Sequence, residues 1–151
     1  MELSKLLEQN RANHYKLLVI VDNSNNHHKI IDPLKDEGWE AFNVNRNALR
    51  LMSNVPMDKI KLRIADEIKK WVLSLPNKVI FYNANILYSP DFGKLNPISA
   101  FKYRARNKEI IVIMEGRLYG NRLVYSQHGR TDYTEMDVGE LICIRMEDID
   151  V

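Results

Sequence analysis

Several features are scarce or missing in this chain, and each absence excludes a class of protein. The 151 residues include a single cysteine, Cys143, so no disulfide within the chain supports the fold. That cysteine stands in the apolar run LICI, where a thiol is more often a small core residue than a nucleophile. No hydrophobic run approaches the ~18 residues of a membrane-spanning helix, and residues 1–7 are acidic and amphipathic rather than signal-like. We therefore expect a cytoplasmic protein with no membrane partner.

A strong charge of one sign is also absent. The chain has 22 Lys and Arg against 20 Asp and Glu, which gives a formal net charge of +2. This balance does not by itself indicate a nucleic-acid partner, so any such surface must come from local clustering. The composition, 45% hydrophobic and 28% charged, is that of an ordinary globular protein. At this length we expect one domain over residues 1–151.

Apolar runs spaced along the chain predict the strands of a sheet. Strands buried on both faces are expected where the sequence reads LLVIV, KVIFY and EIIVIM, at residues 17–21, 78–82 and 109–114. Shorter or more polar strands are expected at residues 39–44, 122–126 and 141–144.

Helical periodicity fills most of the intervals between these runs. Leu3, Leu6 and Leu7 predict an N-terminal cover helix within residues 1–14. Apolar residues recurring every three or four positions predict a long helix over residues 57–75, and Asn96-Pro97 predicts a helix that runs to about residue 106. A short helix disturbed by Pro33 is expected after the first strand.

Strands that alternate with helices predict an α/β fold of three layers, in which a largely parallel sheet is flanked by helices. Residues 117–126 are expected to add an antiparallel edge. In such sheets ligands bind at the carboxyl ends of the strands, so the loops at residues 22–29, 83–85 and 115–120 are the candidate sites.

The loop after the first strand stands where a P-loop protein holds phosphate. A P-loop uses glycines to bring backbone N–H groups onto the phosphates, a lysine to meet them, and a Ser or Thr to hold magnesium. Residues 22–30 contain no glycine, and Lys29 is followed by Ile30 instead of a hydroxyl residue. The strand at residues 78–82 ends in Asn83, where a nucleotide hydrolase is expected to carry an acidic residue near the magnesium.

A resemblance adds to this interpretation. The run VIFYNANILYSPDFGKLNPISAFKYRARNKEIIVIMEG, with FNVNRNALRLMSNVP before it and RLVYSQHGRTDYTEM after it, resembles the BrxF family, small P-loop proteins of bacterial phage-exclusion (BREX) systems. The resemblance covers the chain from about residue 16 to the C-terminus. It implies a reduced P-loop NTPase-like fold and an accessory role in an anti-phage defence locus. It also implies that the first loop and the end of the strand at residues 78–82 once formed the nucleotide site.

We therefore expect a non-hydrolysing component of a defence complex, with other proteins of that complex as partners and with no cofactor, metal or catalytic residue. The vestigial phosphate-loop positions are Asn23, Ser24, Asn25, Asn26, His27, His28, Lys29 and Asn83. The adjacent histidines in this loop lack a third ligand at metal-binding spacing, and His14 and His128 stand alone.

Two alternatives remain open at this stage. One is a working nucleotide hydrolase that binds ATP and magnesium through Lys29 in an atypical loop. The other is a nucleic-acid-binding module, which would use the basic C-terminal half and the rings of Tyr103 and Tyr119. Its candidate residues are Lys102, Arg104, Arg106, Lys108 and Arg117. The competing interpretation is a solvated helix face, because alternate positions on a helix do not share one face.

Overall fold

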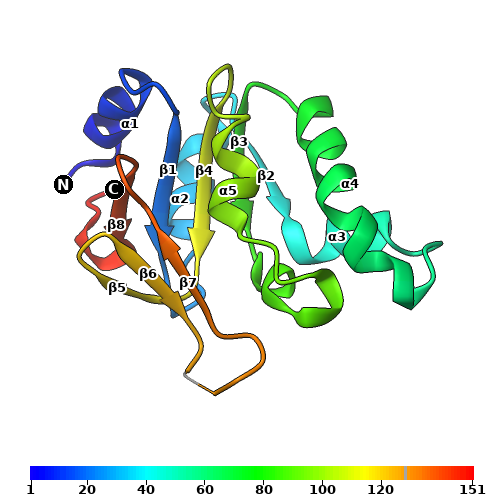
Figure 1. Cartoon of the computed structure of the whole chain (residues 1–151). Helices are drawn as coiled ribbons and strands as arrows, with labels where there is room; N and C mark the ends of the chain where they lie inside the picture. The colour runs from blue at the N-terminus through cyan, green and yellow to red at the C-terminus, as the bar shows by residue number, and fades with distance from the viewer. Residues whose placement is uncertain (128) are drawn as a thin grey trace.

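Five parallel strands form the central sheet (Figure 1). The computed structural model describes residues 1–127 and 129–151, so His128 lies outside the described residues. In spatial order the strands are β2 (Glu40–Asn43), β3 (Lys78–Tyr82), β4 (Glu109–Met114), β1 (Leu17–Val21) and β8 (Ile142–Arg145). Every residue of β1 is buried, because helices or loops cover both faces of this central strand. The strand predictions are confirmed, with shifts of one or two residues at their ends.

Helices lie on both faces of the sheet. The first face is covered by α1 (Leu3–Arg11) and α2 (His28–Lys35), and the second by α3 (Val44–Leu51), α4 (Ile60–Ser74) and α5 (Pro97–Lys102). Alternate residues of β1 point to the two layers, Leu18 and Ile20 to the first and Leu17, Val19 and Val21 to the second. This arrangement confirms the predicted three-layer α/β fold. Within the described part of the chain, no helix is both long and apolar enough to cross a membrane.

Three helices differ in detail from the expectation. The helix α5 ends at Lys102 and not near residue 106, because the chain continues in tighter turns: Arg104 N–H donates to the Phe101 carbonyl and Ala105 N–H to the Lys102 carbonyl, each at 3.1 Å. Pro33 lies inside α2, which begins at His28 and ends two residues after the proline. The start of the long helix at residues 57–75 is a 3₁₀ turn, η1 (Met57–Lys59), before α4 proper.

A second, smaller sheet replaces the expected antiparallel edge. It is formed by β5 (Arg117–Tyr119), β6 (Arg122–Tyr125) and β7 (Thr134–Asp137), which pair with one another and not with the main sheet. The chain turns out of β4 at Gly116, where a Cβ would lie 2.9 Å from Leu123 Cδ1 and from the Val124 carbonyl oxygen. Leu123 and Met136 of the small sheet are buried in the same core as α4 and α5.

The connections leave neighbouring strands toward opposite faces. After β1 the chain passes to α2 on the first face, whereas after β4 it passes to the small sheet on the second face. A crevice at the carboxyl ends of β1 and β4 is the usual consequence of such a divergence, and it is the usual place for a ligand in open α/β sheets. The topology therefore directs attention to the loops predicted from the sequence.

Among the residues that the structure describes, one polar side chain in the core has no hydrogen-bond partner. Asn10 is fully buried on α1, and neither its amide nitrogen nor its amide oxygen makes a hydrogen bond. Burying such a group costs about 1–3 kcal/mol, so Asn10→Leu should raise the free energy of unfolding by about 1–2 kcal/mol in urea titrations. The neighbouring exposed residue supplies the control, since Gln9→Leu should leave stability nearly unchanged. A loss of stability in Asn10→Leu would show that the amide has a structural role.

Candidate functional site

The carboxylate of Asp22 closes the loop that follows β1 onto itself. Its Oδ1 accepts hydrogen bonds from the backbone N–H of Ser24 at 3.1 Å and from the Ser24 hydroxyl at 3.0 Å, and its Oδ2 accepts one from the backbone N–H of Asn26 at 2.7 Å. Asn25, between them, has a left-handed backbone with φ of 55°. Backbone N–H groups that converge on an anion are what a phosphate-binding loop offers. Here the anion is the chain's own side chain, which is only 6% exposed.

The next side chain fastens this loop to the end of β4. The amide nitrogen of Asn23 donates to the Gly116 carbonyl at 2.9 Å, and Gly116 N–H donates to Asn23 Oδ1 at the same distance. This reciprocal pair holds the loop in place against the end of β4.

Lys29, the one cation of the loop, is directed away from the crevice. Its Nζ donates to the Met146 carbonyl at 3.2 Å, which ties α2 to η4 (Met146–Asp148) after the edge strand β8. His28 is exposed and faces Asp32 one turn along α2, with Nδ1 and Oδ1 3.5 Å apart. Neither Lys29 nor His28 therefore lines the crevice where a phosphate would bind.

His27 packs against the end of β3. Its ring stacks on Tyr82 with centroids 4.5 Å apart and planes 20° from parallel. Burial lowers the pKa of His27, the nearby His28 ring lowers it further, and Asp22 acts in the opposite direction. Among the residues that the structure describes, no three His, Cys, Asp or Glu side chains gather in a way that could hold a metal ion.

Asparagines form the opposite wall of the crevice. Asn83 ends β3 in a left-handed conformation with φ of 51°, and its carbonyl accepts from Asn45 N–H at 2.7 Å. The Asn45 side chain donates to Asn85 Oδ1 at 2.6 Å and accepts from Ile86 N–H at 2.9 Å. Neutral amides thus link the ends of β2 and β3 at the place where a hydrolase would present an acidic residue.

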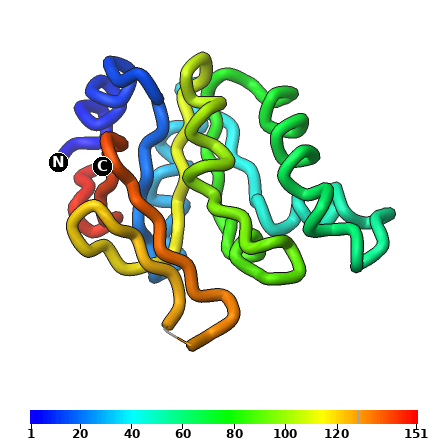
Figure 2. The backbone as a smooth tube through the Cα atoms, in the orientation of Figure 1, coloured from blue at the N-terminus to red at the C-terminus, as the bar shows by residue number. Residues whose placement is uncertain are grey.

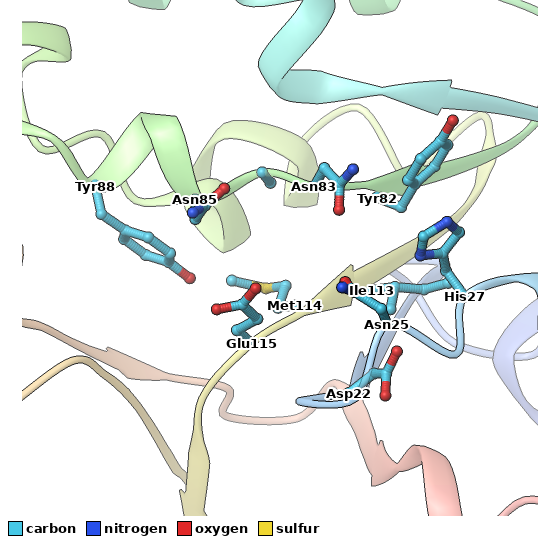
Figure 3. Close-up of a pocket in the computed structure, with 11 residues that line it drawn as sticks. Asp22, Asn25, His27, Tyr82, Asn83, Asn85, Tyr88, Ile113, Met114 and Glu115 are labelled. Carbon is cyan, nitrogen blue, oxygen red and sulfur yellow. The ribbon is translucent and has the colours of Figure 1, made fainter.

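A small hollow lies between these loops (Figure 3). It is lined by Asp22, Asn25 and His27 after β1, by residues 82–85 and Tyr88 after β3, and by residues 113–115 at the end of β4. Its volume is about 20 Å³, which is room for roughly one water molecule. Ligand pockets for drug-sized molecules typically measure ~300–1,000 Å³, so the hollow as it stands admits no nucleotide.

The charge of the hollow is also unsuited to phosphate. Its charged lining residues are the carboxylates Asp22 and Glu115, and no Lys or Arg is among the described residues around it. Tyr88 is buried there, stacked on Tyr125 with centroids 4.1 Å apart, and its hydroxyl donates to the Met136 sulfur at 3.9 Å. Burial first, and then Tyr125 and Glu115, raise the pKa of the Tyr88 phenol. The phenol therefore stays protonated and neutral.

The structure divides the basic residues predicted as one cluster. Residues 102–108 precede β4 and lie at the amino end of the sheet, whereas Arg117 follows β4 at the carboxyl end. Lys108 donates from Nζ to the carbonyls of Leu75 and Pro76 and so caps the end of α4. Of the predicted cluster, Lys102, Arg104 and Arg106 share the segment that begins at the end of α5. Lys108 is bonded to the end of α4, and Arg117 lies at the other end of β4.

Sequence reasoning missed two contributors to this region. It places Asp22 in the loop but does not identify its carboxylate as the central acceptor, although an Asp followed two positions later by Ser is the spacing of an Asx turn. Tyr88 carries no local signal, because it reaches the hollow only through the pairing of β3 and β4. Glu115 opens the candidate loop at residues 115–120 and does line the hollow.

Comparison of the chain with protein-family models, with curated proteins and with solved structures gives no match.

The Asp22 hydrogen bonds should be measurable as stability. Asp22→Ala leaves three donors without their charged acceptor, and we expect the free energy of unfolding to fall by about 2–3 kcal/mol. Denaturant titration measures the loss, with Asp32→Ala on the exposed side of α2 as the control expected to change little. Equal stability of the wild type and Asp22→Ala would contradict the role assigned to this carboxylate.

The environment of His27 should make folding sensitive to mild acid. Its pKa in the folded state is lowered, so the folded state binds fewer protons than the unfolded state below the unfolded value of ~6.5. The stability that His27 contributes is present above that pH and is lost as the pH falls. We expect His27→Gln to lose less stability than the wild type between pH ~7 and ~5.5. Identical pH profiles for the wild type and His27→Gln would count against the buried, stacked histidine.

Proposed function

We propose that this chain is a non-hydrolysing, P-loop-like accessory or assembly component of a bacterial anti-phage defence system of the BREX type. The setting of a phosphate loop is present, since a buried central strand runs into a loop and then a helix at the carboxyl edge of a parallel sheet. The resemblance of the region around β3, α5 and β4 to the BrxF family supports the defence setting.

One observation carries this proposal: the Asp22 carboxylate accepts hydrogen bonds from the backbone N–H groups of the loop. A nucleotide phosphate would have to displace a carboxylate that already holds those donors, and it would do so against the charge of that carboxylate. The hollow offers no compensating cation, because no Lys or Arg is among the described residues that line it and Lys29 Nζ is bonded to the Met146 carbonyl after β8. The loop then has a structural role, and the function rests on contacts with other molecules.

The nucleotide-hydrolase alternative makes an opposite prediction for binding. With ATP and magnesium, titration calorimetry of the purified wild type should show no saturable heat, and Lys29→Ala should give the same flat trace. Saturable binding in the micromolar range that disappears in Lys29→Ala would contradict the proposal and favour the hydrolase.

The assembly role is tested in the source cell. A tagged chain expressed from its own locus should co-purify with other proteins encoded beside it, and loss of the chain should disrupt the complex that they form. The assembly role would be overturned if the chain purified alone and the neighbouring proteins still formed their complex in cells that lack it. This outcome would count against the role whatever the result of the ATP titration.

A further inference from the structure

A different surface lies at the opposite, amino end of the sheet. Two chain segments meet there, residues 14–16 before β1 and residues 102–106 after α5, and both run along the upper rim of the molecule in Figure 2. Their backbones are joined where Lys16 N–H donates to the Ala105 carbonyl at 2.6 Å. The next bond, from Ile110 N–H to the Lys16 carbonyl at 2.9 Å, starts the pairing of β1 with β4. The register of the central sheet thus fixes these two segments side by side.

Aromatic rings and a cation pack together at this junction. The rings of Tyr15 and Tyr103 meet edge to face with centroids 5.7 Å apart. Lys102 Nζ lies 4.9 Å from the centroid of Tyr15 and 5.9 Å from that of Tyr103, within the range of a cation–π contact. Tyr103 nevertheless remains 59% exposed, so part of its ring is free to contact another molecule.

The cations around these rings are not neutralised by neighbouring acids. Lys16, Lys102, Arg104 and Arg106 take part in none of the ion pairs found among the described residues. Lys16 Nζ instead donates to the Arg106 carbonyl at 3.2 Å, which keeps its charge at the surface. Four positive side chains are therefore gathered within two short segments.

A shallow hollow adjoins the exposed ring. It has a volume of about 200 Å³ between α4 and α5, and its lining includes Tyr103, Arg104, Lys69 and Ser99. One carboxylate, Asp66, also lines it. A flat group stacked on Tyr103 would have cations and a hydroxyl within its reach.

We propose that this amino-end surface, formed by Tyr15, Lys16, Lys102, Tyr103, Arg104 and Arg106, binds single-stranded nucleic acid. The cations neutralise backbone phosphates, and the exposed Tyr103 ring stacks on a base, which is the pairing of groups that single-strand binders use. A duplex keeps its bases stacked internally and would leave the ring unused. The inference does not depend on the assembly role, because the surface lies at the other end of the sheet from the Asp22 loop.

Fluorescence anisotropy with a labelled oligothymidine tests the charge component. The wild type should bind at low salt, and affinity should fall steeply as salt is added. Arg104→Ala combined with Arg106→Ala should weaken binding ~10-fold and reduce the salt slope by about 1.4, since each of the two phosphate contacts contributes ~0.7 for single strands. Arg122→Ala combined with Arg130→Ala removes the same charge from the small sheet and should change the affinity less than ~2-fold.

The stacking component needs a separate measurement. Tyr103→Ala should weaken binding to oligothymidine by about 5-fold or more and leave binding to an abasic oligonucleotide of the same length unchanged. Arg104→Lys combined with Arg106→Lys should retain most of the affinity, which separates loss of charge from loss of folding. Absence of binding at low salt would overturn the proposal, as would equal losses in the two double-alanine variants. An equal affinity of the wild type for the abasic strand would also overturn it and indicate a general polyanion or acidic protein surface.

Discussion

The carboxylate of Asp22 is the group on which the carboxyl edge of this protein depends. It is almost fully buried where the central strand ends, and a charge in that position requires hydrogen-bond donors. The nearest ones are the N–H groups of the following loop, and the chain curls through the left-handed Asn25 to present them. The curled shape of the loop thus follows from the burial of this carboxylate.

Amide side chains extend this closure across the sheet. Asn23 joins the loop to the turn after β4, and Asn45 joins the end of β2 to the segment after β3. What remains between them is a hollow of about 20 Å³ bordered by two carboxylates. At the amino edge of the same sheet, lysine and arginine side chains surround an exposed tyrosine ring. The crevice between β1, β3 and β4, where such folds usually hold a ligand, has no room for a nucleotide.

The parts of the fold that could be predicted are those in which the burial of an element requires a recognisable pattern of apolar residues. Strands covered on both faces must be continuously apolar, so β1, β3 and β4 were visible as short hydrophobic runs. The sequence does not reveal the end of α5, because the residues after Lys102 are compatible with a helix although the chain there forms tighter turns with i→i−3 bonds. The small sheet was expected as an edge of the main sheet, because its alternating pattern does not show that Leu123 and Met136 are buried in the core of the second face.

The candidate site shows the same limit. The missing glycines and the neutral Asn83 were readable, but the contact of Lys29 with Met146 joins residues far apart in the chain. Arg117 was grouped with Lys102 because they are close in sequence, yet β4 lies between them and a strand of that length spans about 20 Å. Sequence distance along a strand is therefore a poor guide to clustering at its ends.

The central claim is that the loop N–H groups are already held by Asp22 and are not available to a nucleotide. An amide-resolved NMR spectrum with and without ATP and magnesium tests it most directly. The account predicts that the resonances of Ser24 and Asn26 keep their positions at millimolar ATP. Saturable shifts confined to those two amides and their neighbours would show that phosphate enters the loop, and would contradict it.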